Sequence, residues 1–320
     1  MNNDGLNIVL ITQGISRVVK PLFESRHNLI GIIEDAPRDQ RKPDFLKRKL
    51  LEIIHIFKAS NNLNDFCKKH NLAYFYLNKE TKNKVIEWLE VIKPDIIVVF
   101  SMSHLLSEDI FNWPKYKTIN LHTAFLPEFR GPNPDFWHYY YQVTNPGITV
   151  HYIDKGEDTG DIIFQERYRL ELGIKSSQRS DKLVGEVGVK LLLKTLDAIQ
   201  NGDAPRIKQP VISPTTRARN LKPEEHSSVV NWKEWKIDRI WNLLRGTESW
   251  LNALPPPKGL FVGQRWIIEE MILKDDIPNE LFGKIRKENG KYFVYCKGGK
   301  IHLSVKLKLK LLIKRLLGIG

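Results

Sequence analysis

Cysteine is scarce in this sequence, because Cys67 and Cys296 are the only two. Two cysteines exclude a disulfide-rich scaffold and a zinc site built on cysteines, and they suit a reducing compartment. Long apolar runs are missing as well: the longest uncharged one, IIVVF, is far shorter than the roughly 20 residues that span a bilayer. The N-terminal MNNDGLNIVLIT lacks the basic head and the apolar stretch of a signal peptide. We therefore predict a soluble, cytoplasmic protein.

Acidic residues are outnumbered by basic ones, and the net charge is +13. This surplus suits an anionic partner such as nucleic acid, a phosphorylated metabolite or a membrane surface. A solvated basic surface explains it as well, so charge does not choose among these classes. The apolar share of 42% and the charged share of 27% are those of an ordinary globular protein. The 320 residues suffice for one large domain or two smaller ones.

Strands alternate with helices in the first part of the chain. Apolar runs predict buried strands at 7–11, 29–34, 95–100 and 118–122. Helix-like spacing occurs between them, at 15–26 and 84–92. This alternation predicts an α/β, Rossmann-like fold, with a mostly parallel sheet and helices on both faces. The basic, proline-punctuated segment 37–49 is predicted to be an exposed loop that enters a helix.

The pattern changes after Gly147. Two further strands are predicted at 148–154 and 161–170, and a long helix at 177–200. The turn signal NGDAP predicts a domain boundary, with residues 1–205 in a larger domain and residues 206–320 in a smaller one. We expect the smaller, C-terminal domain to hold a helix near 236–246 and a β-rich, OB-like fold.

The stretch NLHTAFLPEFRG, at 120–131, places two polar side chains at the end of a predicted strand. Asn120 and His122 are two residues apart and so share one face of the strand. In open parallel sheets, ligands bind at the carboxyl ends of the strands. Downstream, DKGEDTGD at 154–161 is a polar loop between two strands. If it folds back over the strand end, a carboxylate can orient His122 and raise its basicity.

These motifs together resemble the formyltransferase family that uses N10-formyltetrahydrofolate. Asn-x-His, Leu-Pro, Arg-Gly and Asp-Thr-Gly-Asp follow one another at the family's spacing, over most of residues 1–200. The resemblance implies that residues 1–205 are the catalytic domain and that Asn120, His122 and Asp158 are the catalytic residues. Taken singly, each of the three also suits a turn cap or a satisfied core group.

Formyl transfer explains each residue type of this trio. An amine attacks the formyl carbon, and the Asn120 amide can donate a hydrogen bond to the tetrahedral oxyanion. A neutral His122 can carry the proton from the amine to the leaving N10. Asp158 would hold the His122 ring and tune its pKa.

The resemblance also implies a folate pocket. The co-substrate is predicted to be N10-formyltetrahydrofolate, and no metal is expected. A flat pterin suits backbone edges between apolar walls. The implied contacts are His104, Leu105, Leu106, Asp154, Lys155, Gly156, Glu157 and Asp158. For Leu105 and Leu106 plain core packing is an alternative, and His104 is expected to contribute its backbone rather than its ring.

The acceptor amine divides this family. The continuation PNPDFWHYYYQ and the N-terminal ITQG resemble members that formylate nucleotide-linked amino sugars more than the tRNA enzymes. We therefore expect transfer to a dTDP- or UDP-linked amino sugar, in lipopolysaccharide and O-antigen synthesis, with methionyl-tRNA as the alternative acceptor. The family member that formylates UDP-4-amino-4-deoxyarabinose has an arginine directly after Arg-Gly, whereas this chain has Pro132. The identity of the sugar therefore stays open. The expected substrate contacts are Arg130, Trp137, Arg245 and Trp250, although Trp250 suits core packing equally well.

The sugar acceptor implies a homodimer and no nucleic-acid partner. The last twenty residues, IHLSVKLKLKLLIKRLLGIG, suit an edge strand with solvent-facing lysines, or a basic tail in weak contact with a membrane surface. A non-enzymatic nucleic-acid or membrane-binding protein is a third hypothesis. The presence of Asn120, His122 and Asp158 argues against it.

Overall fold

The computed structural model describes residues 5–36 and 62–305. The predicted loop at 37–49 and most of the basic tail lie outside the described residues. The chain divides into two compact units, each made of several segments. The first unit comprises residues 1–134, 146–168 and 180–218, and the second comprises 135–145, 169–179 and 219–320. The predicted division at residue 205 stays a prediction.

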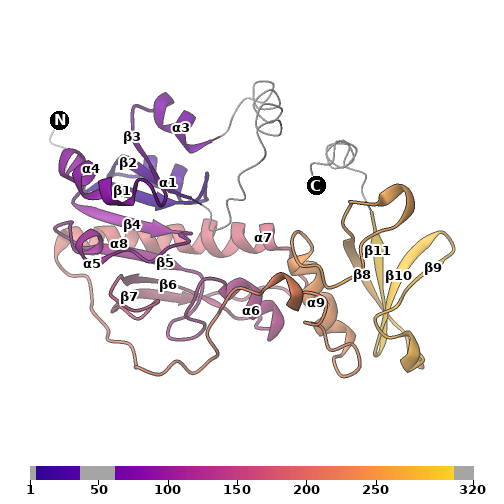
Figure 1. The fold of residues 1–320 in the computed structure, drawn as a ribbon. Helices are drawn as coiled ribbons and strands as arrows, with labels where there is room; N and C mark the ends of the chain where they lie inside the picture. Colours follow the sequence, from indigo (N-terminus) through magenta and orange to yellow (C-terminus); the bar gives the residue numbers. More distant parts are fainter. Residues whose placement is uncertain (1–4, 37–61, 306–320) are drawn as a thin grey trace. The chain divides into compact units, whose positions relative to one another are not determined.

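A seven-stranded sheet organises the first unit (Figure 1). Its strands are β1 (Asn7–Thr12), β2 (Asn28–Asp35), β3 (Ala73–Leu77), β4 (Ile96–Phe100), β5 (Thr118–His122), β6 (Gly147–Tyr152) and β7 (Ile162–Arg167). They lie in the order β3-β2-β1-β4-β5-β6-β7. The first five strands in this order run parallel, and β6 and β7 are antiparallel to their neighbours. The predicted Rossmann-like, mostly parallel sheet is confirmed.

Helices cover both faces of this sheet because successive side chains of each strand point to opposite sides. In β4, Ile96 and Val98 belong to one core cluster and Ile97 and Val99 to the other. The first cluster includes residues of the helices α1 (Val19–Phe23), α3 (Leu63–Lys69), η2 (Asp181–Gly188) and α8 (Val189–Asn201). The second includes residues of α4 (Val85–Ile92) and α5 (Glu108–Phe111). The core of the first unit therefore consists of two apolar layers, one on each face.

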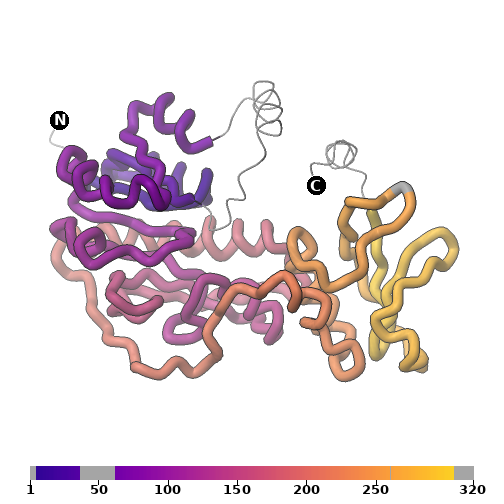
Figure 2. Tube along the Cα trace, viewed as in Figure 1, coloured from indigo at the N-terminus to yellow at the C-terminus, as the bar shows by residue number. Residues whose placement is uncertain are grey.

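The helices within the described residues are mostly short. They are α1 (Val19–Phe23), α3 (Leu63–Lys69), η1 (Lys82–Lys84), α4 (Val85–Ile92), α5 (Glu108–Phe111), α6 (Pro134–Tyr140), α7 (Ser176–Ser180), η2 (Asp181–Gly188), α8 (Val189–Asn201) and η3 (Pro223–Glu225). The last three in sequence are α9 (Ile237–Thr247), η4 (Gly259–Phe261) and η5 (Asn279–Leu281). The run α7-η2-α8 corresponds to the helix predicted at 177–200. After α8 an irregular segment follows, which pairs with β7 through Ile162 and Ile207 (Figure 2).

The second unit contains a separate antiparallel sheet. Its strands are β8 (Ile267–Leu273), β9 (Ile285–Glu288), β10 (Lys291–Cys296) and β11 (Gly299–Ser304), in the order β8-β11-β10-β9. Helix α9 packs on β8 and β11, and Ile237, Ile240, Leu243 and Leu244 of its apolar face are buried. The predicted β-rich C-terminal part is confirmed, although its described residues form four strands rather than the five of an OB barrel.

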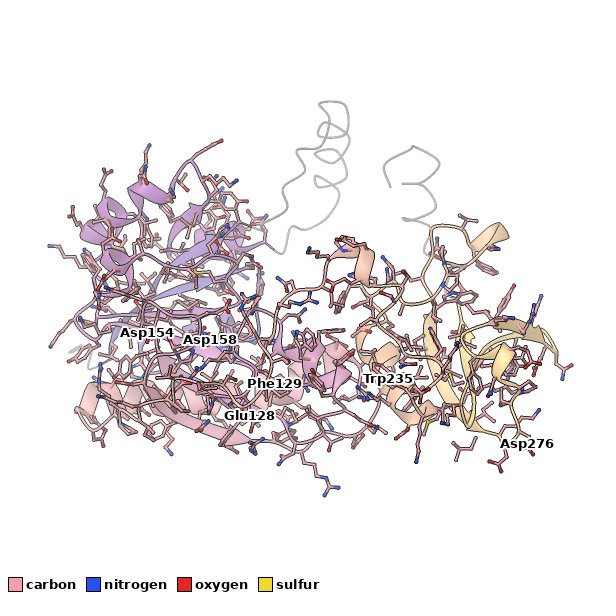
Figure 3. All side chains as sticks on the ribbon, turned by 60° about the horizontal axis from the view of Figure 1, so that its bottom comes forward. Glu128, Phe129, Asp154, Asp158, Trp235 and Asp276 are labelled. Carbon is pink, nitrogen blue, oxygen red and sulfur yellow. The ribbon has the colours of Figure 1, made fainter. Side chains whose placement is uncertain are left out.

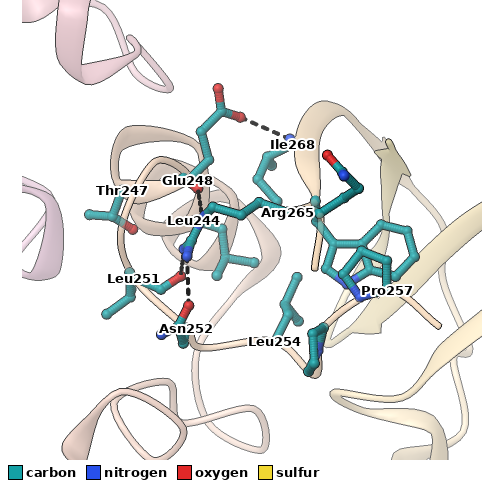
Figure 4. A pocket seen from close by; sticks show the side chains of 12 residues that line it. Leu244, Thr247, Glu248, Leu251, Asn252, Leu254, Pro257, Arg265 and Ile268 are labelled. Atoms are coloured by element: carbon teal, nitrogen blue, oxygen red, sulfur yellow. Dashed lines mark hydrogen bonds between the residues drawn. The ribbon is translucent and has the colours of Figure 1, made fainter. Parts of the chain in front are cut away.

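A cavity of about 370 Å³ lies in the second unit, between the end of α9 and the start of β8 (Figure 4). Arg265 fixes its wall by donating hydrogen bonds to the carbonyl oxygen of Leu251 at 2.6 Å and to Asn252 Oδ1 at 2.7 Å. Glu248 closes the same wall, because its carboxylate accepts the Ile268 N–H at 2.9 Å. Each of the three guanidinium nitrogens of Arg265 thus donates a hydrogen bond within the unit.

Candidate active site

Two polar side chains of β5 occupy the carboxyl end of a parallel strand, as predicted. Asn120 pairs with Val99 of β4 on one side and with His151 of β6 on the other. His122 ends β5, and its side chain is only 7% exposed. Because β5 lies between β4 and β6, both side chains are held inside the sheet, at the carboxyl edge of the parallel strands.

Asp158 reaches this strand end from the loop that joins β6 to β7 (Figure 3). Its Oδ1 accepts a hydrogen bond from Asn120 Nδ2 at 3.3 Å, and its Oδ2 lies 3.6 Å from His122 Nδ1. The Asp158 side chain is 13% exposed. Its backbone is left-handed, with φ 55°, a conformation that aspartate tolerates better than most residues. The structure therefore brings the three predicted side chains together, while their catalytic role stays a prediction.

Gly131 of the Arg-Gly motif also binds the Asp158 carboxylate. Its backbone N–H donates to Asp158 Oδ2 at 2.9 Å. Its φ is +126°, and a Cβ on this residue would lie 2.9 Å from the carbonyl oxygen of Ala218. Only glycine fits this backbone conformation and this close approach.

The environment of Asp158 keeps its carboxyl group ionised. Burial by itself would raise its pKa, but the charge of His122, the contact with His151 and the Gly131 N–H outweigh burial. Together they hold the pKa of Asp158 well below the ordinary value of 3.8. The site thus contains a permanent negative charge beside two imidazole rings.

Both ring nitrogens of His122 face hydrogen-bond acceptors. Nε2 lies 3.2 Å from the carbonyl oxygen of Phe129, and Nδ1 lies 3.6 Å from Asp158. A carbonyl oxygen can only accept, so Nε2 carries a proton in this arrangement. A second proton on Nδ1 would be matched by Asp158. Both ring nitrogens of His122 are therefore held against oxygen atoms of the protein at this strand end.

Sequence reasoning missed His151 of β6. Its side chain is 2% exposed, and its Nδ1 donates to the carbonyl oxygen of Tyr152 at 2.8 Å. Its Nε2 lies 3.2 Å from Asn120 Nδ2 and 3.5 Å from Asp158 Oδ1. A buried histidine in the otherwise apolar run ITVHYI was the available signal. Only the pairing of β6 with β5 shows that His151 stands opposite Asn120.

Arg130 is buried and donates hydrogen bonds to Gln209 instead of presenting its guanidinium at the surface. Its buried guanidinium donates to Gln209 Oε1 at 2.8 Å and to the carbonyl oxygens of Pro210 and Val211 at 2.8 and 3.1 Å. Gln209 in turn donates to the Asp158 carbonyl oxygen at 3.0 Å. Arg130 therefore stabilises the segment that holds the Asp158 loop, and Gln209 is a second residue that the sequence did not reveal.

The loop after β4 holds the first group of predicted folate contacts. Leu105 is 71% exposed, whereas Leu106 packs against the core cluster that also receives Ile153. The ring of His104 is 42% exposed, and its Nδ1 lies 2.9 Å from Asp35 Oδ1. The expectation that His104 serves through its backbone alone therefore overlooks a definite contact of its ring.

The loop before Asp158 holds the second group. Asp154 Oδ1 accepts the Gly156 N–H at 3.0 Å, which turns the loop. Lys155 pairs with Glu108 at 2.9 Å, next to the loop after β4. Glu157 is paired with Arg217. The two predicted walls of the folate pocket thus lie side by side.

The remaining predicted substrate contacts belong to the second unit. Trp137 Nε1 donates to the carbonyl oxygen of Arg219 at 2.9 Å, and its ring stacks on Tyr141. Arg245 donates to the carbonyl oxygens of Gly173 at 2.8 Å and Ile268 at 2.7 Å. These side chains stabilise the unit from within.

Trp250 follows the same pattern as Trp137. Its ring packs edge-on against Phe136 at 5.8 Å and against His226 at 5.6 Å. The packing interpretation therefore accounts for its position.

Neither a metal cluster nor a membrane-spanning helix was found within 5–36 and 62–305. Groups of three or more histidine, cysteine, aspartate and glutamate residues able to hold a metal ion do not occur among these residues. Their helices are all too short or too polar to cross a bilayer.

Comparison with known proteins identifies relatives of this chain. The family model described as "Formyl transferase" matches residues 40–196. A methionyl-tRNA formyltransferase of a Sulfurihydrogenibium species is 30% identical over 301 residues, which are 90% of this chain and 86% of that protein. A methionyl-tRNA formyltransferase of Clostridium acetobutylicum is 31% identical over 60% of this chain, and the match spans 61% of its own length.

A solved structure shows the same fold. The N-formyltransferase from Helicobacter canadensis, in complex with folinic acid and dTDP-3-aminofucose, superposes with a TM-score of 0.61. The match covers 94% of this chain and all of that chain, at 15% sequence identity. At this identity the likeness concerns the fold alone.

The predicted amino-sugar acceptor is wrong, and so is the exclusion of a nucleic-acid partner. The relatives at 27% to 32% identity are named methionyl-tRNA formyltransferases, whereas sugar formyltransferases share only the fold. The sugar interpretation rested on features such as Trp137, whose ring and N–H are used in packing. The lipopolysaccharide and O-antigen assignment falls with it, and the expected homodimer stays a prediction.

The predicted family is confirmed, and enzymes of this family use N10-formyltetrahydrofolate, as the sequence indicated. The match to the Sulfurihydrogenibium enzyme extends over most of both chains. This chain belongs to the formyl transferase family.

Proposed function

We propose that this protein transfers a formyl group from N10-formyltetrahydrofolate to the amine of methionyl-tRNA. The observation that carries the proposal is the 30% identity, over 301 residues, with a relative of that name. The meeting of Asn120, His122 and Asp158 at one strand end supports it. In the reaction, the bond from the formyl carbon to N10 breaks, a bond to the amine nitrogen forms, and one proton passes from the amine to N10.

Asn120 is the proposed donor to the oxyanion. In the resting site its Nδ2 faces Asp158 and His151, at 3.3 and 3.2 Å. Hydrogen bonds in a resting site often rearrange when the substrates bind. We infer that the amide exchanges one of these contacts for the oxyanion as the tetrahedral intermediate forms. One such donor is worth about 3–4 kcal/mol in acyl transfer.

His122 is the proposed carrier of the proton. Its ring is buried, and its two nitrogens face the Phe129 carbonyl oxygen and the Asp158 carboxylate. Asp158 remains charged because its pKa is held low. Asp158 can therefore stabilise the imidazolium that forms when His122 receives the proton of the amine. His122 becomes neutral again when that proton passes to N10.

The residues around the trio fit a flat folate ring. We infer that the loop after β4 and the loop before Asp158 form its two walls, because the pair Lys155–Glu108 brings these loops side by side. Leu106 and Ile153 are apolar side chains of these two loops, and both pack against the same core cluster. When bound, N10-formyltetrahydrofolate supplies the formyl group. The protein residues orient its ring and shield the reacting carbon from water.

Basic side chains of the second unit suit an RNA acceptor. Strands β9 and β10 and the residues around them carry exposed cations, which are Lys284, Arg286, Lys287, Lys291 and Lys297. Lys287 stands opposite Tyr292 and lies 5.6 Å from its ring. Cations beside aromatic faces are typical of surfaces that bind nucleic-acid backbones and bases. The net charge of +13 has the same sign.

An acceptor competition tests the proposal. The protein is incubated with N10-formyltetrahydrofolate and either methionyl-tRNA or a panel of dTDP- and UDP-linked amino sugars, and the products are read by mass. We expect a gain of one formyl group on the methionyl-tRNA. Binding of that tRNA should weaken steeply with salt, since phosphate contacts release counterions. Formylated sugars with unmodified methionyl-tRNA would refute the proposed acceptor.

A further inference from the structure

A second polar cluster lies at the carboxyl ends of β2, β1 and β4, separate from the trio. Asp35 ends β2, Gln13 follows β1, and Ser103 and His104 follow β4. These three strands are neighbours in the sheet, in the order β2-β1-β4. Residues that are 22 and 90 positions apart along the chain therefore meet at one edge.

Asp35 is the centre of this cluster. Its side chain has no exposed surface. Oδ2 accepts the Ser103 N–H at 2.6 Å and Gln13 Nε2 at 3.2 Å, and Oδ1 lies 2.9 Å from His104 Nδ1. Gln13 Nε2 also donates to the Ser103 hydroxyl. One buried carboxylate thus binds the loop after β4 at two successive residues.

The contact with Asp35 fixes the tautomer of the neutral His104 ring. A carboxylate accepts hydrogen bonds, so Nδ1 carries the proton. In the neutral ring Nε2 is then an acceptor. The ring is 42% exposed, whereas its carboxylate partner is fully buried. His104 can therefore present a fixed acceptor at the surface of the loop.

This loop is one wall of the folate pocket described above. It continues from Ser103 and His104 to Leu106, which packs on the same core as Ile153, and to Glu108, which pairs with Lys155. Any movement of Ser103 or His104 relative to β2 would therefore change the width of the pocket. The pair Asp35–Gln13 links that wall to the sheet.

We propose that Asp35 is a positioning residue for the folate pocket. It holds the Ser103 backbone and the His104 ring, so that His104 Nε2 accepts a hydrogen bond from an N–H donor of the pterin. The proposal rests on the formyl donor of the proposed function and is independent of the acceptor. It also gives Gln13 a role, because its amide closes the same network.

Two substitutions of His104 separate the inner contact from the outer one. The amide of His104→Asn can replace Nδ1 and keep the contact with Asp35, whereas the longer His104→Gln can replace the outer acceptor. Tetrahydrofolate binding, measured by titration calorimetry, should weaken about tenfold in His104→Asn, the loss of one hydrogen bond. His104→Gln should retain most of the affinity. Equal affinities for the two variants would overturn the proposed acceptor role.

A double-mutant cycle tests the role of Asp35. Asp35→Asn should also weaken tetrahydrofolate binding about tenfold and raise the KM for the formyl donor, with kcat changed less than about threefold. Adding His104→Asn to Asp35→Asn should cost little more, because each change removes the same proposed hydrogen bond between His104 Nε2 and the pterin. Additive losses, or a lowered Tm with unchanged tetrahydrofolate affinity, would overturn the proposal.

These measurements also separate this inference from the proposed acceptor. Wild-type protein that binds tetrahydrofolate but leaves methionyl-tRNA unmodified would refute the acceptor and leave the role of Asp35 intact. If Asp35→Asn does not fold, the comparison of His104→Asn with His104→Gln still decides whether the ring contacts the pterin.

Discussion

The two units use similar polar residues in different ways. In the first unit, Asn120, His122 and Asp158 direct their polar atoms toward one another at a strand end. In the second unit, Trp137 and Arg245 direct theirs toward backbone carbonyl oxygens of their own unit. A polar side chain that meets other ionisable side chains can do chemistry, whereas one that meets main-chain oxygens has its hydrogen bonds already used.

This difference in contacts distinguishes the predicted catalytic residues from the predicted substrate contacts, and both roles stay predictions. The trio was predicted from the resemblance to the formyltransferase family, together with the chemistry that its residue types permit. Trp137 was singled out by its place in PNPDFWHYYYQ and Arg245 by its charge, and neither signal shows where a side chain's hydrogen bonds go. We therefore expect substitutions in the first group to change the rate, and those in the second group to change the stability.

The largest expected effect comes from His122→Ala. Removing the proton carrier should lower kcat by about two to four decades, the usual contribution of general acid–base catalysis. Single-turnover kinetics with saturating substrates gives this rate directly. His70→Ala is the matched control, since His70 follows α3 and packs against Phe23 and Phe66. An unchanged kcat in His122→Ala would remove the ring from the mechanism.

Arg245→Met sharpens the comparison from the other side. It would leave the carbonyl oxygens of Gly173 and Ile268 without their donor, which should lower the free energy of unfolding by about 2–4 kcal/mol. Urea denaturation measures this loss, and Lys258→Met, at an exposed position, serves as the control. A loss of activity at full stability would instead return Arg245 to the list of substrate contacts.

The effect of Asp158→Asn on the free energy of unfolding should depend on pH. Because the folded pKa of Asp158 is depressed, its ionised form contributes stability above the ordinary value of 3.8, and this contribution is lost as pH falls toward the folded pKa. Wild type should be the more stable protein at pH about 7, and the difference from Asp158→Asn should shrink below pH about 4. Urea denaturation across this range measures it. A difference that stays constant with pH would mean that the charge of Asp158 contributes nothing.

The smallest expected effect concerns the acceptor surface. Lys287→Gln should weaken tRNA binding modestly and reduce the slope of log affinity against log salt by about one, the value for one lost phosphate contact. Lys79→Gln, at an exposed position of the first unit, removes the same charge as a control. Equal slopes for Lys287→Gln and wild type would exclude Lys287 from the tRNA surface.

The sequence predicted the central strands of the fold well, for a physical reason. β1, β2, β4 and β5 are almost completely buried, and buried parallel strands appear as continuous apolar runs. β3 escaped prediction because AYFYL lies at the edge of the sheet and is only partly buried. As an edge strand it lacks the fully buried aliphatic run that marks β4.

The trio could be predicted because its members follow a spaced motif, whereas the residues around it could not. His151 depends on the antiparallel register of β5 and β6, and Gln209 depends on the path of the chain after α8. Asp35 and Ser103 meet only because β2, β1 and β4 are neighbours in the sheet. A single sequence carries no direct record of such pairings.

The most direct test of the central claim is the single-turnover rate of formyl transfer by Asn120→Ala, with wild type measured alongside. Removing one donor to the oxyanion should lower this rate by about two to three decades while tetrahydrofolate binds as before. A rate within a few-fold of wild type would show that Asn120 does not stabilise the transition state, and would contradict the proposed role of this strand end.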